Sequence, residues 1–533
     1  MSLGLIGILF FFFTTYRLCS PSFLYNALSD ELYGLGVLWR NGIGPWIQGY
    51  LGRDGLHLYH GHIARYFYAG VFYLFGSSWP VVRIVPAVLG VITIVFTYLF
   101  LRELVHRRVA LLAVFLLGIH PTFILGTKLG SVNVSYLQTI MMGTLYLLAC
   151  WMRRGGTLYL YAAMIGLGLG VASRIWFIWC IVALVPGLSI YWKNRGFGPW
   201  NMRTGVTIIV ALGLFSVFPS MMMKTEIHQG FDCLKKFAAR SRHPDQKEYP
   251  ARIGRVSREL HLLMKDGFDE YTAPETIEED AEGRPCRPLG SFTPFFFWGA
   301  LALLCMALTK KDLDHRDGKL FIVVVVGMLL FQIFLPGREP NRLHLFIIYP
   351  FPQIILAIAC DVGYRIWMTK YWMRTVFLGL MVLFVAGEVN GVRYYMDRMR
   401  HGDNRYFCKA IYDAAGYLNE GSPKRPGLTL LMMESTVLNT VIFLLNEKGR
   451  LKYDFGDVDG QSLEKTTVDY ENDYGEMIYL DVSGFDLDEK RVEAWAQKNR
   501  FQMSPLGISF DDGTRDARVR LYSLKKSVRG KLQ

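Results

Sequence analysis

Two adjacent carboxylates stand near the start of the chain, in the stretch SDELY at residues 29–33. Asp30 and Glu31 follow an apolar N-terminal run, and an acid pair close to a bilayer usually has a cation or a proton to manage. One hypothesis is therefore a catalytic pair that handles a proton. The alternative is local, because Ser29 as an N-cap with acids in the first turn explains the same stretch by helix capping.

A second group of residues is basic and falls in segments that the charge pattern places on the same side as the acid pair. Its members are His57, His60, His62, Arg65, Lys128, Arg174, Arg338, Arg342 and His344. Arg and Lys at a membrane boundary bind phosphate oxygens through charge-assisted hydrogen bonds, and Arg can do so in bidentate fashion. For any single residue, snorkelling to lipid headgroups is the alternative. For the group together with the acid pair, we favour a lipid-phosphate site.

Acids and cations at an external membrane surface suit one reaction type in particular. A sugar on a polyprenyl phosphate can be attacked at its anomeric carbon while a carboxylate deprotonates or orients the acceptor and cations stabilise the departing phosphate. The eight cysteines show no CxxC or Cys/His metal spacing, so they predict neither a zinc site nor a disulfide framework. No cofactor is predicted, and a divalent cation beside Asp30 and Glu31 stays an open alternative.

Membrane helices must position these residues. The chain has 533 residues, of which 52% are hydrophobic and only 19% charged, and long charge-free runs predict a multi-pass membrane protein. The predicted spans are Leu3–Tyr16, Ile84–Leu101, Val109–Thr127, Val132–Met152, Gly155–Ser173, Ile175–Trp192, Thr204–Met223, Leu289–Thr309, Leu320–Gly337, Leu343–Cys360 and Thr375–Gly387. The first run has no Lys or Arg before it, so we interpret it as an uncleaved helix.

Orientation follows from basic residues in the short loops. One alternating set of loops holds fifteen Lys and Arg and the other holds four, so the first set and the N-terminus are predicted to be cytoplasmic, in the plasma (inner) membrane. Loop charge also explains the net charge of +13, and nucleic acid is not a predicted partner. Residues 17–80, residues 224–288 and everything after about residue 390 are then external.

The external segments differ in character. The stretch HGHIARYFYAGVFYLFG at residues 60–76 favours a helix lying along the interface, whereas residues 224–288 suit either a substrate-gating loop or a connector. Beyond residue 393 the pattern predicts a small α/β domain with a partly parallel sheet and no phosphate-binding glycine loop. Its predicted strands are GLTLLMM, EMIYLDVSG and ARVRLYSLKK, and helices are predicted between them at STVLNTVIFLLNEKG and DEKRVEAWAQKNRF. The predicted domains are thus a transmembrane part, residues 1–392, and a soluble part, residues 393–533.

Three stretches together resemble the GT-C glycosyltransferases that use lipid-linked sugars, a superfamily that includes the protein O-mannosyltransferases, the lipid A aminoarabinose transferases and the RgtA-like enzymes. They are SDELY, the block that begins LYHGHIARYFYAGVFYLFG, and REPNRLHLFIIYPFPQIILAIA. The resemblance covers residues 25–360. It implies a GT-C fold with about eleven or more membrane helices, a polyprenyl-phosphate sugar donor, and a glycan, glycolipid or protein acceptor.

The resemblance also implies residue roles: Asp30 is the catalytic base, Glu31 positions the base or the acceptor, and Arg338, Arg342 and His60 contact the donor phosphate.

Two positions depart from the family pattern. Gly61 and His62 replace the usual Pro-Pro, and the loop before the fourth helix has Lys128 and Asn133 where Arg and Asp are common. Because Asn133 cannot act as a general base, a mechanism centred on Asp30 is favoured over one with two carboxylates.

Other classes remain as alternatives. A transporter of lipid-linked sugars would also be polytopic, but inverted repeats and broken midplane helices are not evident in the sequence. A polyprenyl-diphosphate glycan ligase or polymerase would use external Arg and His without a carboxylate, and a membrane scaffold would need none of these groups. Asp30 in an external cavity with Arg338 or Arg342 would separate the first hypothesis from the others.

Overall fold

The computed structural model describes the membrane part of the chain and the strands of a C-terminal sheet. The described residues are 2–16, 62–76, 79–129, 135–174, 177–195, 207, 209–217, 249–265, 291–310, 313–334, 345–367, 371–401, 429–431, 452–454, 476–482, 501–511 and 518–526.

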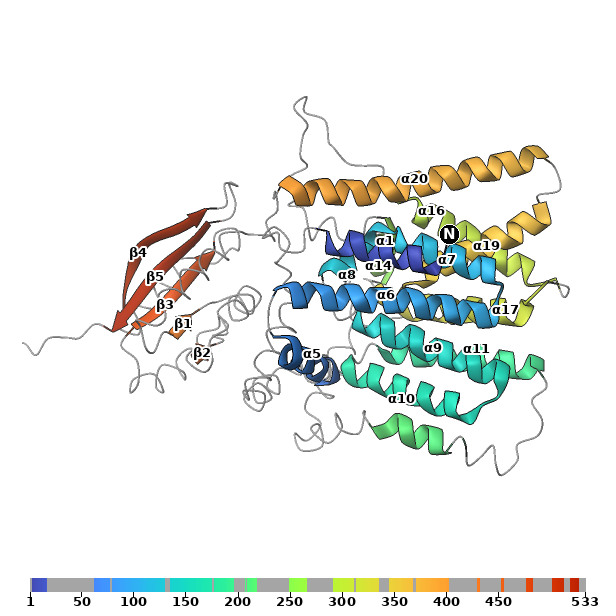
Figure 1. Ribbon diagram of the computed structural model, residues 1–533, viewed down its shortest axis with the longest axis horizontal. Helices are drawn as coiled ribbons and strands as arrows, with labels where there is room; N and C mark the ends of the chain where they lie inside the picture. The colour runs from blue at the N-terminus through green and yellow to red at the C-terminus, as the bar shows by residue number, and fades with distance from the viewer. Residues whose placement is uncertain are drawn as a thin grey trace, which may run out of the picture.

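The membrane part is a bundle of roughly parallel and antiparallel helices (Figure 1). Its helices are α1 (Leu3–Thr15), α5 (His62–Phe75), α6 (Trp79–Leu104), α7 (Arg107–Gly118), α8 (Pro121–Leu129), α9 (Tyr136–Arg154), α10 (Thr157–Ser173), α11 (Ile178–Arg195), α14 (Tyr249–Lys265), α16 (Thr293–Ala307), α17 (Arg316–Phe334), the 3-10 turn η4 (Phe346–Ile348), α19 (Phe351–Trp367) and α20 (Tyr371–His401).

The bundle has two chemically different ends. At one end, where α6 ends and α9 ends, Arg153 and Arg154 both bond the carboxylate of Glu103. Asp314 and Arg365 form a 3.0 Å ion pair at the start of α17 and the end of α19. We call this the ion-pair end. The opposite end, where α1 ends and α6 begins, is called the loop end, and Figure 1 shows the C-terminal sheet beyond it.

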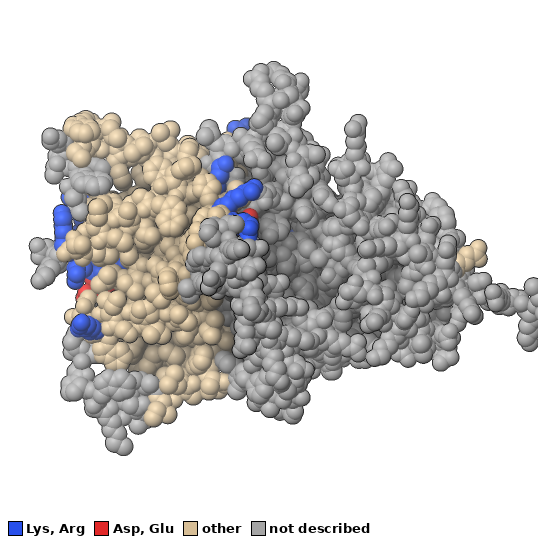
Figure 2. Space-filling view, turned by 180° about the vertical axis from the view of Figure 1, so that it is seen from behind, with Lys and Arg blue, Asp and Glu red and all other residues tan. Residues whose placement is uncertain are grey.

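Four of the described helical stretches are long and apolar enough to cross a membrane: Arg83–Leu104, Arg316–Phe334, Phe346–Arg365 and Tyr371–Arg393. The bent pair α7 and α8 makes a fifth candidate, and shorter apolar helices include α1, α10, α11 and α16. On the face in Figure 2, Lys and Arg gather at the two ends of the described bundle and leave a belt without charged side chains between them. This is the surface expected of a protein embedded in a bilayer.

The predicted span Val109–Thr127 is not one helix. The structure breaks it at Ile119 and His120, and α7 and α8 meet at an angle of 59°. The cause is Pro121, the first residue of α8, because proline lacks an N–H and disfavours helical backbone in the preceding residue. The break opens the backbone at mid-bundle, where other polar groups can reach it.

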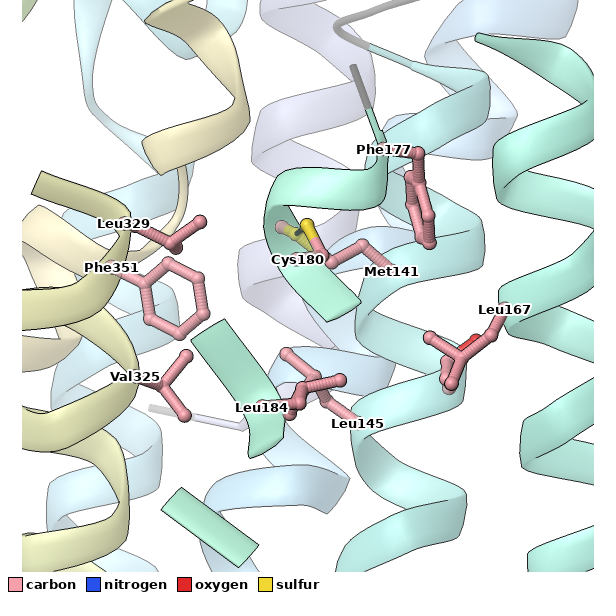
Figure 3. Close-up of a pocket in the computed structure, with 10 residues that line it drawn as sticks. Met141, Leu145, Leu167, Phe177, Cys180, Leu184, Val325, Leu329 and Phe351 are labelled. Carbon is pink, nitrogen blue, oxygen red and sulfur yellow. Dashed lines mark hydrogen bonds between the residues drawn. The ribbon is translucent and has the colours of Figure 1, made fainter. Parts of the chain in front are cut away.

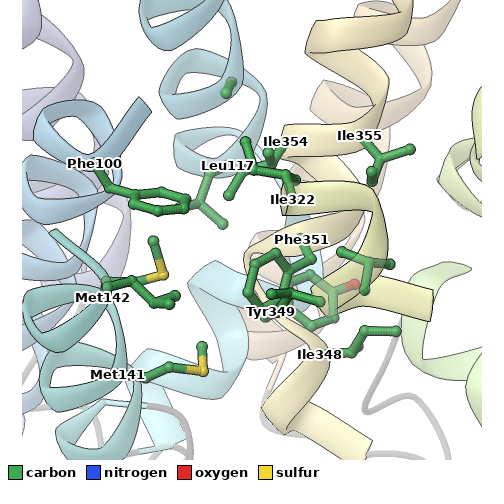
Figure 4. Close-up of a cluster of buried hydrophobic side chains, with 14 of the residues drawn as sticks. Phe100, Leu117, Met141, Met142, Ile322, Ile348, Tyr349, Phe351, Ile354 and Ile355 are labelled. Carbon is green, nitrogen blue, oxygen red and sulfur yellow. The ribbon is translucent and has the colours of Figure 1, made fainter. Parts of the chain in front are cut away.

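The core lies where α6, α7, α9, α17 and α19 meet (Figure 4). Phe100, Met142, Ile322 and Ile354 are buried there, and Phe346 stacks on Tyr349 with ring centroids 4.8 Å apart. Large apolar side chains from five helices thus fill one continuous cluster, which stabilises their arrangement by removing apolar surface from solvent and lipid.

The C-terminal strands form one mixed sheet in the order β2-β1-β3-β5-β4. They are β1 (Thr429–Leu431), β2 (Lys452–Asp454), β3 (Glu476–Val482), β4 (Phe501–Asp511) and β5 (Arg518–Lys526). β1 pairs in parallel with β2 and β3, whereas β3 with β5 and β4 with β5 are antiparallel. β4 carries a register shift between Pro505 and Ser509.

The partly parallel sheet agrees with the sequence, since β1, β3 and β5 fall on predicted strands. The helices predicted between them lie outside the described residues, so the α/β character of this region and the boundary at residue 393 stay predictions. α20 itself continues to His401. The stretch predicted as an interfacial helix is helical and forms α5, with Tyr73 and Phe75 exposed, while its place at the interface stays a prediction. The count of eleven spans also stays a prediction.

Candidate functional site

Most of the predicted site residues fall in segments whose placement is not described. Those outside the described residues are Asp30, Glu31, His57, His60, Asn133, Arg338, Arg342 and His344. His62 and Arg65 are described only as backbone positions in α5. Lys128 and Arg174 are described with their side chains, so the framework around the site must be built from them and from their neighbours.

Lys128 joins three elements at the loop end. It lies in the last turn of α8 and is only 3% exposed. Its Nζ donates to the carbonyl oxygen of Tyr16, directly after α1, and lies 5.8 Å from the centre of the Tyr16 ring. Arg83, from the start of α6, donates from Nη1 to the carbonyl oxygen of Lys128 over 2.7 Å. Two buried cations therefore stand where the segment containing Asp30 and Glu31 leaves α1.

The described residues that flank the other predicted site segments also lie at the loop end. Arg174 directly follows α10 and is buried. Gln138, in the first turn of α9, donates from Nε2 to the carbonyl oxygen of Phe346 over 2.9 Å. This bond places the start of α9, just after residue 133, beside the chain that follows residue 344. The described flanks of residues 17–61, 130–134 and 335–344 thus all belong to the loop end.

The structure adds one cation that the sequence analysis did not single out. Arg252 lies in α14, within the predicted external segment 224–288, on the same face as the buried Val256, Leu260 and Leu263. It is 5% exposed, and its Nε and Nη1 have no hydrogen-bond partner among the described residues. Buried guanidinium nitrogens that find no hydrogen-bond partner among the described residues are costly, and arginine does not escape the cost by losing its proton. A guanidinium in this state can bind an anionic ligand.

A sequence signal for Arg252 did exist. Its spacing of four and eight residues from Val256 and Leu260 puts it on the apolar face of an amphipathic helix, where an arginine is out of place. α14 packs against α8, α16 and α17, so it covers the bundle near the helices that lead into the predicted site segments.

α14 also carries a histidine, His261, whose pKa is perturbed. Burial and the nearby charge of Lys265 lower the pKa of His261 below its ordinary value. The His261 ring meets the Phe295 ring edge to face, with centroids 5.6 Å apart, which joins α14 to α16.

An apolar pocket lies between α9, α10, α11, α17 and α19 (Figure 3). Phe177 lines it near the loop end, only three residues after Arg174, and Leu184, Val325 and Phe351 also line it. Of its ten lining residues, Thr144 alone carries a hydroxyl group. The pocket is therefore a small, almost wholly apolar gap in the packing of these helices.

Comparisons with known proteins agree with this architecture. Residues 59–222 match the family model described as "Dolichyl-phosphate-mannose-protein mannosyltransferase". A comparison with curated protein sequences found no match.

Two solved proteins are similar in structure. The Archaeoglobus fulgidus oligosaccharyltransferase, solved with a tethered acceptor peptide, has a TM-score of 0.56 at 13% identity, over 93% of this chain and 70% of its own. ArnT from Cupriavidus metallidurans, bound to undecaprenyl phosphate, has a TM-score of 0.54 at 13% identity, over 98% of this chain and 97% of its own. A further structure from Archaeoglobus fulgidus is that of the oligosaccharyltransferase AglB in complex with an inhibitory peptide and a dolichol-phosphate. It has a TM-score of 0.52 at 12% identity, over 99% of this chain and 74% of its own.

The chain has the fold of the GT-C glycosyltransferases, and the predicted superfamily is confirmed. The matched family and both similar proteins are GT-C glycosyltransferases, in agreement with the predicted enzyme class.

Proposed function

We propose that the protein transfers a sugar from a polyprenyl-phosphate-linked donor to an acceptor at the loop end of the bundle. One observation carries the proposal: the buried cations Lys128, Arg83 and Arg174 stand at the end where the chain enters the segments with Asp30, Asn133 and Arg338. Cations held in a low-dielectric site stabilise a departing phosphate. The lipid-bound states of the two similar enzymes support a donor of this kind.

In the proposed mechanism, Asp30 accepts the proton of the acceptor nucleophile, or orients it, as that atom attacks the anomeric carbon. The bond between this carbon and the phosphate oxygen breaks, and the polyprenyl phosphate leaves with the bonding electrons. Glu31 positions Asp30 or the acceptor, while Arg338, Arg342 and His60 hold the phosphate. Lys128 and Arg252 add positive charge to the same group.

The acceptor is proposed as a glycan, glycolipid or protein. The proposal places the loop end and the C-terminal sheet outside the plasma membrane and the N-terminus inside, as the loop charges predict. No metal cluster of His, Cys, Asp or Glu occurs among the described residues. Asp30 and Glu31 lie outside that set, so a divalent cation beside them stays open.

The decisive test is sugar transfer by purified variants in detergent, from a radiolabelled polyprenyl-phosphate sugar. Asp30→Asn keeps the size of the side chain but removes its charge and basicity, so turnover should fall by about 10²–10⁴-fold. Glu31→Gln should lose less. If Asp30 serves only in a capped helix, Ser29→Ala should instead lower thermal stability without affecting chemistry. Full activity of Asp30→Asn would remove the acid from the mechanism and favour a carboxylate-free ligase.

A further inference from the structure

A cluster of buried polar groups lies inside the bundle, where α20 meets the break between α7 and α8. Glu388 of α20, His120 and Thr122 at the break, and Ser291 and Thr293 at the start of α16 are each at most 1% exposed. None of them belongs to the predicted site. Ionisable residues at membrane depth are costly, and they are usually retained for a function.

One oxygen of the Glu388 carboxylate is hydrogen-bonded at the start of α16, and the other lies against the α7–α8 break without a hydrogen-bond partner among the described residues. Its Oε1 accepts hydrogen bonds from the hydroxyl of Ser291 and, over 3.0 Å, from the hydroxyl of Thr293. The backbone N–H of Thr293 in turn donates to Ser291 Oγ over 3.0 Å. The second oxygen, Oε2, lies 3.8 Å from Nε2 of His120. One carboxylate therefore connects α20, the start of α16 and the α7–α8 break.

The break is also tied to the end of α14. His120 donates from Nε2 to the carbonyl oxygen of Met264 over 3.2 Å, and Thr122 donates to the carbonyl oxygen of Leu263 over 2.8 Å. The hydroxyl of Tyr349 donates to the same Leu263 oxygen over 3.1 Å. These bonds use the last carbonyl groups of a helix, which have no partner within the helix itself.

Two glycines allow α20 to approach this closely. A Cβ atom at Gly387 would lie 2.8 Å from the Phe292 ring, and one at Gly391 would lie 2.7 Å from Pro121. Elsewhere α20 exposes large apolar side chains such as Leu378 and Val382. The short face around Glu388 is thus where α20 docks onto the break.

The helix that starts at this break ends at Lys128. α8 has nine residues and is held at both ends: His120 and Thr122 fix its start, while the bonds from Lys128 to Tyr16 and from Arg83 to Lys128 fix its last turn. A helix of this length spans about 13 Å and transmits a shift at one end to the other.

We infer that Glu388 is a positioning residue that, by fixing the α7–α8 break, sets where Lys128 stands at the loop end. The inference rests on the proposed function insofar as Lys128 contacts the donor phosphate. An apolar residue of similar volume in place of Glu388 would avoid the cost of burying a carboxyl group. The carboxyl group of Glu388 therefore does more than fill space in the packing.

The test is a double-mutant cycle on donor use. Glu388→Leu should raise the KM for the polyprenyl-phosphate sugar by about tenfold or more, because small displacements of a binding group are expensive. In a Lys128→Met background the same change should have little further effect on this KM. Glu388→Gln, whose amide oxygen still accepts from both hydroxyls, should restore most of the donor KM. Equal loss in both backgrounds would overturn the inference.

A matched control is Glu103→Leu, which removes another buried carboxylate at the ion-pair end, 4% exposed in its side chain. It should lower thermal stability and leave the donor KM unchanged. If Glu388→Leu does not fold, the double variant Ser291→Ala/Thr293→Val removes both hydroxyl donors and should shift the donor KM in the same direction. An unchanged donor KM in that double variant would contradict the inference.

A second readout does not depend on activity. In Lys128→Cys, an impermeant maleimide should label residue 128 faster when Glu388→Leu is also present, as measured by mass spectrometry of that peptide. Faster labelling, together with a protein that transfers no sugar even when Lys128 and Glu388 are both intact, would keep the positioning role and refute the proposed function. Unchanged labelling would refute the positioning role, whatever the activity.

Discussion

The guanidinium of Arg83 donates a 2.7 Å hydrogen bond to the backbone carbonyl oxygen of Lys128. A cation at the start of α6 therefore donates to the backbone at the end of α8. The bond satisfies a carbonyl group at a helix end and brings a second positive charge beside the Lys128 ammonium. Like charges held together inside a protein favour the binding of an anion.

Lys128→Met should weaken donor use while preserving the fold. The change keeps the apolar stem and removes the charge, and a hydrogen bond to a charged group contributes about 1.5–3 kcal/mol, equivalent to roughly tenfold or more in the donor KM. Lys193→Met, at the ion-pair end of α11, is the matched control and should behave as wild type. Equal donor KM values for the two variants would contradict the phosphate role of Lys128.

Arg252→Met should have opposite effects on stability and on donor use. Because Arg252 is buried and its Nε and Nη1 have no partner among the described residues, an apolar replacement should keep or raise the melting temperature. If Arg252 binds the donor phosphate, the donor KM should rise by about tenfold. Arg258→Met, at an exposed position of the same helix, should change neither quantity. A large loss of stability in Arg252→Met would instead indicate a structural role.

Acid should weaken the packing of α14 on α16. The pKa of His261 is lowered in the folded protein, so below its ordinary value of about 6.5 the unfolded state binds more protons than the folded state. The contribution of His261 to stability is therefore complete above that pH and declines as the pH falls toward the lowered pKa. His261→Phe should keep the contact with Phe295 and flatten the dependence of the melting temperature on pH between about 6.5 and 5. An unchanged slope would exclude His261 as the cause.

The orientation can be tested in intact cells. If the C-terminal sheet is external, a cysteine placed at Trp495 should react with an impermeant thiol reagent without lysis. A cysteine at Arg154, which bonds Glu103 at the ion-pair end, should react only after lysis. Protection of residue 495 until lysis would reverse the topology.

Apolar runs predicted most helices of the bundle because a bilayer requires long stretches of uncharged residues. The same rule failed at Glu388. The predicted last span stops at Gly387 because a charge follows it, whereas α20 continues to His401 and buries that charge against Ser291 and Thr293. Hydrogen bonds from residues about one hundred positions away reach one oxygen of the carboxylate, Oε1, and no local pattern reveals them.

The break at His120 had a local signal in Pro121, but the apolar residues on both sides suggested one continuous helix. Among the strands, the three-residue β2 was too short to show alternation, and β4 contains Pro505 and Gly507, which disfavour strands. For the site, residue types alone predicted the basic group that includes Lys128 and Arg174. The bond between Arg83 and Lys128 depends on tertiary packing and could not be predicted.

The irregularity in β4 has a consequence for how copies of the protein behave at high density in a membrane. Among the described strands, β4 forms one edge of the sheet and β2 the other, so the side of β4 away from β5 presents backbone groups that another chain could pair with. Pro505 lacks one such donor, and the register shift that ends at Ser509 twists the strand away from a flat edge. Both features hinder the β4 edge from pairing with a strand of another molecule. Neighbouring molecules therefore stay separate when they are crowded.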